Sequence, residues 1–181
     1  IFLLELADLL SIVKFKLFDT ICHEHLEYYS AKVVMGMLKK NDLKLIDIRK
    51  NNINGGSVRF YITSKNSKFK VKNDNIKKYI SEERRYKLDK KKVFSDLFKY
   101  ISKLKIKLNK KLINFKRTGK EIHGYGASTK GNVLLQYFGI DNKILTLIAD
   151  RNPEKNGLYT PGTKIKIVTE NKSRKLKPDY Y

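Results

Sequence analysis

The segment FDTICHEHLEYYS, residues 18–30, places titratable side chains at three consecutive positions, His23, Glu24 and His25. The chain has three histidines, and the third, His123, lies far away in the sequence. Imidazole exchanges protons near neutral pH, and a neighbouring carboxylate can orient the ring or change its basicity. The pattern is typical of acid–base chemistry, while a metal site and a hydrogen-bonded structural pair remain alternatives at this point.

A metal site in this segment would need ligands from elsewhere in the chain. The spacing His-Glu-His differs from the HExxH pattern of zinc proteases. If the segment is extended, His23 and His25 point to one side and Glu24 to the other. A zinc site needs three or four ligands, and His123 is the only spare histidine. We therefore predict no metal site in this chain.

A second motif, GYGASTKG at residues 124–131, combines glycines with a lysine. Gly124 and Gly126 permit a tight turn, and the amides that open the following helix can hold a phosphate. Asp150 ends the next expected strand, where dinucleotide-binding folds place an acid on the ribose. The spacing, however, departs from both the GxGxxG and the P-loop patterns. An NAD site, a site for another phosphate compound and a turn without any ligand all remain open.

The elements that position these motifs follow from the apolar periodicity of the chain. Four stretches carry helical spacing: residues 2–13, 27–40, 73–85 and 90–117. Three stretches are expected to be extended, the last of them after a Gly-Gly turn: residues 15–21, 43–50 and 54–64. Residues 119–140 predict a strand, a glycine turn and a helix, and a buried strand follows at 143–150. These last elements form a β-α-β unit.

Two of the predicted helices have a defined apolar face. In the first, within residues 27–40, this face consists of Val33, Val34, Met37 and Leu38. In the long helix at 90–117 it consists of Val93, Leu97, Ile101, Leu104, Leu108 and Leu112. The opposite face of the long helix is rich in lysine, and we interpret it as a solvated face.

The formal net charge of +22 raises the question of a polyanionic partner. The lysines are spread along the whole chain and mix with Asn and Ile, as codon bias toward A and T would produce. We therefore do not expect nucleic acid as a partner, and a basic nucleic-acid-binding module stays an alternative. The single cysteine excludes an internal disulfide framework and indicates a cytoplasmic location.

The apolar start IFLLELADLLSIV is neither a signal peptide nor a membrane span. It lacks a basic leading region and a small-residue cleavage site, and it carries Glu5 and Asp8 within a short stretch. We expect no membrane partner. Because the chain begins at Ile1 and stops at KPDYY, we also expect it to be a fragment of a longer protein.

Five blocks in the same order resemble the C-terminal part of the S-adenosylmethionine-dependent sugar C-methyltransferases, which act on nucleotide-linked keto-deoxysugars. The blocks are FDTICHEHLEYYS, NGGSVRFYI, GYGASTKGNVLLQYFGI, IADRNPEKNGLYTPGTKIKI and KPDYY. They cover nearly the whole chain apart from the apolar start and residues 65–118. The resemblance implies an enzyme whose S-adenosylmethionine site and zinc-binding cysteines lie upstream, so no cofactor-binding residue is expected here.

The resemblance also implies an α/β fold class. An incomplete Rossmann-like C-terminal domain would be preceded by helices and strands from the end of a methyltransferase domain. Residues 1–64 would carry the end of the methyl-donor and catalytic region, with the HEH motif. Residues 65–118 would form a helical connector, and residues 119–181 the truncated Rossmann-like domain for the sugar nucleotide.

Methylation of a carbon beside a ketone requires removal of the adjacent proton and stabilisation of the enolate oxygen. By resemblance, His25 is the expected base, Glu24 contacts or orients the substrate, and His23 belongs to the same catalytic motif. The family usually has a tyrosine where this chain has Cys22, and a thiol is a poor hydrogen-bond donor. Tyr28 is our candidate to replace that tyrosine.

The implied partner is a nucleotide-diphosphate sugar. Lys130 would supply point charge to a phosphate, with Ser128 and Asn132 beside it on the glycine turn. Further expected substrate contacts are Tyr28, Arg59, Tyr125 and Tyr159. An NAD-binding oxidoreductase domain remains a second alternative, because the glycine turn and Asp150 would also suit a dinucleotide.

Overall fold

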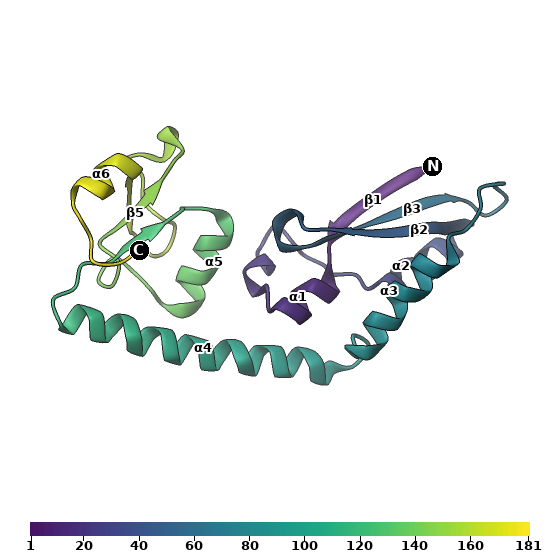
Figure 1. The fold of residues 1–181 in the computed structure, drawn as a ribbon, viewed down its shortest axis with the longest axis horizontal. Coiled ribbons are helices and arrows are strands. Elements are labelled where there is room, and N and C mark those ends of the chain that lie inside the picture. Colours follow the sequence, from purple (N-terminus) through teal and green to yellow (C-terminus); the bar gives the residue numbers. More distant parts are fainter. The chain divides into compact units, whose positions relative to one another are not determined.

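The structure, a computed structural model, describes residues 1–181 except the side chain of Asn54, and it divides into two compact units, residues 1–100 and 101–181. Each unit contains its own three-stranded sheet (Figure 1). The sheet of the first unit is antiparallel and that of the second is parallel. The predicted α/β class is confirmed at this level. No helix among the described residues is both long enough and apolar enough to cross a membrane.

The sheet of the first unit has the strand order β1-β3-β2. Its strands are β1 (Phe2–Ala7), β2 (Leu43–Asn51) and β3 (Ser57–Ser64). A short 3-10 helix, η2 (Ile53–Gly55), and Gly56 join β2 to β3, so the two predicted strands and the Gly-Gly turn before the second are confirmed, and the structure pairs them antiparallel. The central strand is buried because alternate apolar side chains enter the core: Val58, Phe60 and Ile62.

The predicted helix at residues 2–13 is wrong over its first half. Residues 2–7 form β1, which pairs with β3, and the helix α1 covers only Leu9–Phe15. The apolar run FLLELA fits the period of a helix as well as that of a strand. Its pairing with β3, which is distant in sequence, makes it a strand. The extended stretch predicted at 15–21 is also wrong: Lys16 ends α1 in a left-handed conformation, and the 3-10 helix η1 (Phe18–Thr20) follows.

Asp8 fixes the junction between β1 and α1. Its carboxylate accepts hydrogen bonds from the Leu10 amide at 3.1 Å and from the hydroxyls of Ser11 and Tyr79, both at 2.6 Å. The backbone amide of Asp8 donates to the Gly56 carbonyl at 3.1 Å. Because these partners come from the turn and from a helix distant in sequence, the end of β1 is held in one place.

Three further predicted helices are confirmed: α2 (Ala31–Lys40), α3 (Asn73–Arg85) and α4 (Lys91–Arg117). The helix α2 begins later than predicted, because Ser30 caps it and accepts a hydrogen bond from the Val33 amide. Its buried face is Ala31, Val34 and Leu38, whereas Val33 and Met37 are exposed, so their predicted place on that face is wrong. Along α4, Leu97 and Ile101 of the predicted stripe are buried.

The second unit confirms the predicted β-α-β unit. Its elements are β4 (His123–Tyr125), α5 (Thr129–Phe138), β5 (Leu147–Asp150), the 3-10 helix η3 (Pro153–Lys155), β6 (Lys166–Thr169) and α6 (Glu170–Lys175). The strand order is β4-β5-β6, with all neighbours parallel. The strand β5 is shorter than predicted, because Asp141 holds the amides of residues 143–145 in a turn.

The C-terminal residues lie beside the other edge of β4. Ile122 and Tyr180 form a parallel bridge, and the His123 amide donates to the Tyr180 carbonyl at 3.0 Å. The Tyr180 ring stacks on Phe115 of α4, with ring centroids 4.2 Å apart. The segment 179–181 therefore extends the parallel sheet on the side of β4 that β5 does not occupy.

Candidate functional site

The HEH motif lies in a tight turn, so the alternation of side chains that an extended segment would give does not apply. The His25 amide donates to the Cys22 carbonyl at 3.0 Å, which closes a turn over residues 22–25. The side chains of His23 and Glu24 are 84% and 58% exposed, and His23 Nε2 lies 4.0 Å from Glu24 Oε1. All three motif side chains are therefore accessible to a substrate.

The turn places Glu24 and His25 at a hollow of about 530 Å³. The end of β1 forms one part of its lining, and the segment after the motif forms the rest: Glu5, Leu6, Ala7, Leu26, Glu27, Tyr28 and Tyr29. The described lining contains three carboxylates and no lysine or arginine. In a chain with a net charge of +22, this local excess of negative charge is distinctive.

Tyr28 shapes the hollow beside His25. The two rings meet edge to face, with centroids 6.3 Å apart and planes at 62°. The Tyr28 hydroxyl donates to the Thr20 carbonyl at 3.0 Å. Burial, and after it the neighbouring Cys22, raises the pKa of Tyr28, so the phenol stays protonated at neutral pH. Because this proton already forms the hydrogen bond to the Thr20 carbonyl, the Tyr28 hydroxyl has no second proton to donate to a substrate.

Glu5 is a member of this site that our sequence reasoning did not identify. Its Oε1 accepts from Asn51 Nδ2 at 2.7 Å and from Ser57 Oγ at 2.8 Å. Its Oε2 accepts from Arg59 Nε at 2.8 Å and Nη2 at 2.6 Å. Hydrogen bonds from Asn51, Ser57 and Arg59, in that order, lower the pKa of Glu5 to about 2.

Arg59 is therefore occupied by Glu5 rather than placed directly on the hollow. The two residues face each other because Glu5 of β1 and Arg59 of β3 are partners in the antiparallel register. The only sequence signal for this pair was the single acid within the apolar run FLLELA. Arg59 acts on the hollow through Glu5, which it orients.

The glycine turn of the second unit brings together Tyr125, Ser128, Lys130 and Asn132. Ser128 caps α5, and its Oγ accepts from the Gly131 amide at 3.1 Å. Asn132 Oδ1 is buried and has no hydrogen-bond partner among the described atoms. Tyr159, 59% exposed, belongs to a separate loop and bridges to Lys166.

Asp150 closes the glycine turn. Its Oδ2 accepts from the Ala127 amide at 2.7 Å, and its Oδ1 accepts from the Asn152 amide at 2.8 Å. Burial raises the pKa of Asp150, but the amides of Asn152 and Ala127 and the charge of Lys155 outweigh it, and the pKa is lowered. Since both oxygens are engaged by the turn, this geometry disfavours the NAD alternative, in which Asp150 would bind a ribose.

His123 lies in the second unit, apart from the HEH motif. It is 1% exposed, with Nδ1 2.8 Å from Ser173 Oγ and Nε2 3.4 Å from Glu121 Oε1. Among the described side chains, no three His, Cys, Asp or Glu residues are grouped as metal ligands would be.

Comparison with known proteins adds two findings. The family of C-methyltransferase C-terminal domains matches residues 52–181. C-methyltransferase NovU from Streptomyces niveus is 25% identical over 181 residues, which is 100% of this chain and 43% of NovU. The chain thus spans less than half the length of that relative.

Proposed function

Because the chain belongs to the family of C-methyltransferase C-terminal domains, we propose that it is part of an S-adenosylmethionine-dependent enzyme that methylates a carbon of a nucleotide-linked keto-deoxysugar. The observation that carries the proposal within this chain is the hollow that holds Glu24 and His25. S-adenosylmethionine supplies the methyl group when bound. We assign no residue of this chain to it, and we place its site and a zinc site upstream.

In this proposal His25 removes the proton beside the ketone, and Glu24 contacts or orients the sugar. His23 belongs to the same turn and is open to solvent. The described lining of the hollow has no lysine or arginine to attract a phosphate, so the hollow suits a neutral sugar ring. Since Tyr28 already donates to Thr20, we assign its ring to the wall beside His25.

We place the diphosphate on the glycine turn, at Ser128, Lys130 and Asn132. Phosphates bind well at a turn that leads from a parallel strand into a helix, where backbone amides are available. The strand order of β4, β5 and β6, extended by residues 179–181, supports a Rossmann-like domain here. Lys130 contributes point charge, and Tyr159 is a further substrate contact.

We propose that the chain has three parts, as the motifs indicate. Residues 1–64 are the end of the methyl-donor and catalytic region, residues 65–118 are a helical connector, and residues 119–181 are the domain that binds the sugar nucleotide. Exposure at the edge of the first sheet supports the first assignment. In edge strand β1, Phe2 and Leu3 are 60% and 53% exposed, and such apolar edges are usually covered. A larger methyl-donor sheet would cover this one.

The decisive experiment uses the full-length methyltransferase that contains this chain. Without the methyl donor, a base at His25 exchanges the proton beside the ketone with solvent, so the enzyme incorporates deuterium from D₂O into the sugar. We expect His25→Ala to abolish this exchange, and Met37→Ala, on the exposed face of α2, to leave it unchanged. Exchange at the normal rate in His25→Ala would contradict the proposed role.

A further inference from the structure

In the parallel sheet, the strands that follow β4 in the chain are added on both of its sides. From β4 the chain continues on one side to β5 and β6, while segment 179–181 lies on the other side. In open parallel sheets, ligands bind outside the carboxyl ends of the strands at such a switch point. The residue at the carboxyl end of β4 is Tyr125, and the glycine turn follows it directly.

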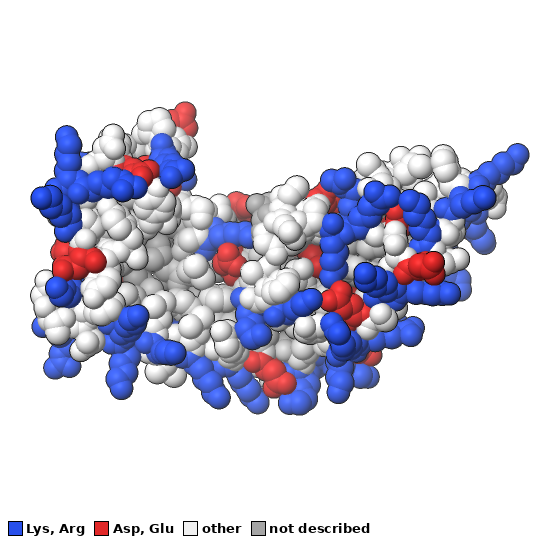
Figure 2. Space-filling view, viewed as in Figure 1, with Lys and Arg blue, Asp and Glu red and all other residues white. Residues whose placement is uncertain are grey.

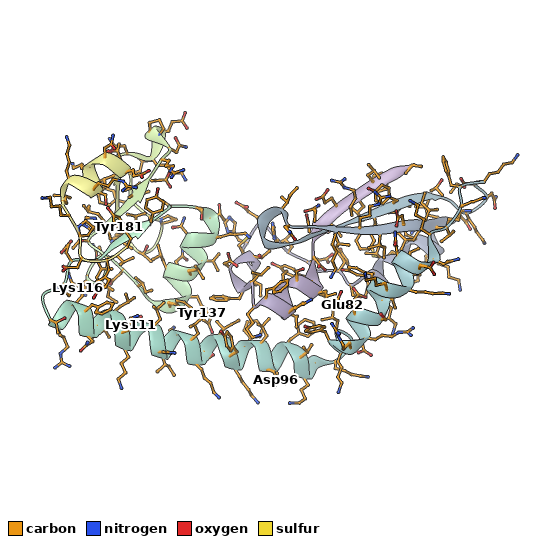
Figure 3. The ribbon with its side chains drawn as sticks, in the orientation of Figure 1. Glu82, Asp96, Lys111, Lys116, Tyr137 and Tyr181 are labelled. Atoms are coloured by element: carbon orange, nitrogen blue, oxygen red, sulfur yellow. The ribbon has the colours of Figure 1, made fainter. Side chains whose placement is uncertain are left out.

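Tyr125 is 50% exposed and has contacts on its hydroxyl and its ring. Arg151 Nε donates to its hydroxyl at 3.2 Å and also to Glu170 Oε2 at 3.2 Å. The ring of Tyr181, labelled in Figure 3, stands edge-on to the ring of Tyr125, with centroids 6.0 Å apart and planes at 89°. Glu170 is in turn held by Arg174, at 3.0 Å from its Nε.

The surroundings of Tyr125 thus fix both the hydroxyl and one side of the ring. A large, half-exposed aromatic side chain with oriented contacts at such an edge of a parallel sheet offers a surface on which a flat π system can stack. Stacking on an aromatic side chain accepts any nucleobase, because every base has a π face. The cationic side chain of Arg151, 80% exposed, lies at the rim of this surface.

We propose that Tyr125 is the stacking platform for the base of a nucleoside diphosphate whose phosphates lie on the glycine turn. This inference rests on the proposed function, which places the diphosphate of the sugar nucleotide at that turn, and adds where its base binds.

The test measures binding to the full-length methyltransferase that contains this chain by titration calorimetry, with thymidine, uridine and guanosine diphosphates and with inorganic pyrophosphate, which has no base. We expect Tyr125→Ala and Tyr125→Leu to weaken nucleoside diphosphate binding by about tenfold or more, since both lose the π face. Pyrophosphate affinity should not change. Tyr125→Phe keeps the ring and should bind within about twofold of the wild type.

Two controls separate this inference from the function on which it rests. Tyr100→Ala removes another exposed tyrosine, in the first unit, and should change neither affinity. Lys130→Ala should weaken pyrophosphate and nucleoside diphosphates alike. Unchanged nucleotide affinity in both Tyr125→Ala and Tyr125→Leu would overturn the platform and leave the diphosphate site standing. A wild-type enzyme that binds neither pyrophosphate nor any of the nucleotides would overturn both.

Discussion

Glu5 lines the same hollow as His25, yet its carboxylate is not suited to act as a second base there. Asn51, Ser57 and Arg59 donate four hydrogen bonds to it, which occupy the acceptor positions of both oxygens. With its pKa lowered to about 2, the group stays ionised at neutral pH. Glu5 is therefore a fixed carboxylate whose charge is balanced by Arg59, and the pair joins β1 to β3 beside the hollow.

The same hydrogen bonds predict how Glu5 affects stability as pH changes. Its pKa is lower in the folded chain than its ordinary value of 4.5, so its stabilising effect is present above pH 4.5 and is lost as pH falls toward 2. Glu5→Gln should therefore lower the urea midpoint at pH 7, and the difference from the wild type should shrink at pH 3. Equal differences at both pH values would contradict this, and Glu154→Gln, at an exposed acid, is the control.

For Glu83 we expect the opposite dependence of stability on pH. It is 5% exposed, it accepts from the Ala31 amide at 2.7 Å, and burial raises its pKa. Protonated Glu83 therefore favours the folded state below pH 4.5, and this advantage is lost as pH rises through the raised pKa. Glu83→Gln keeps an acceptor for Ala31 and removes the buried charge.

We accordingly expect Glu83→Gln to raise the urea midpoint at pH 7 and to have little effect at pH 4. Glu83→Ala also removes the charge but loses the acceptor at the start of α2, so it should be less stable than Glu83→Gln by about 1 kcal/mol at either pH. A glutamine variant less stable than the wild type at pH 7 would show that the charge itself is favourable.

At the scale of elements, local sequence was sufficient where one period dominated. The long helix α4 follows from apolar residues that recur about every four positions. The strand β3 follows from its apolar alternation after a Gly-Gly turn. Residues 2–7 could not be assigned in this way, because FLLELA fits a helix as well as a strand until β3 pairs with it. For the same reason the Glu5–Arg59 pair was not predictable. The pair depends on the register between β1 and β3, and the residue pattern within one strand does not determine that register.

The turn over residues 22–25 was missed for a related reason. The motif CHEH contains no Gly or Pro, the residues that mark most turns, and one backbone hydrogen bond between Cys22 and His25 decides its shape. The β-α-β unit, by contrast, was predictable because Gly124 and Gly126 stand between a strand pattern and a helix pattern.

Two glycines provide a matched test of how the first unit is built. Gly56 has φ +144°, and a Cβ there would lie 2.7 Å from the Ser11 side chain, which bonds to Asp8. Gly56→Ala should therefore destabilise by about 1–3 kcal/mol through backbone strain, with more from the clash. Gly36 lies within α2 with nothing near its Cβ position, so Gly36→Ala should stabilise by about 0.5–1 kcal/mol. Urea unfolding of both variants checks the sign of each change.

For the whole molecule, the charge of +22 is distributed rather than focused. Figure 2 shows Lys and Arg over both units, with Asp and Glu among them. The described lining of the hollow at His25, in contrast, has carboxylates and no lysine or arginine.

The two units should also respond separately to damage in their cores. Phe60 of β3 and Ile148 of β5 are 0% and 2% exposed, and each belongs to the sheet of one unit. Truncation to alanine should cost about 3–5 kcal/mol at Phe60 and about 2–5 kcal/mol at Ile148, since each leaves a cavity. Native-state hydrogen exchange should then show lower protection in β2 and β3 for Phe60→Ala, and in β4 and β5 for Ile148→Ala. Loss of protection across both sheets from either substitution would instead mean that residues 1–181 unfold as one cooperative body, with no independent sugar-nucleotide unit.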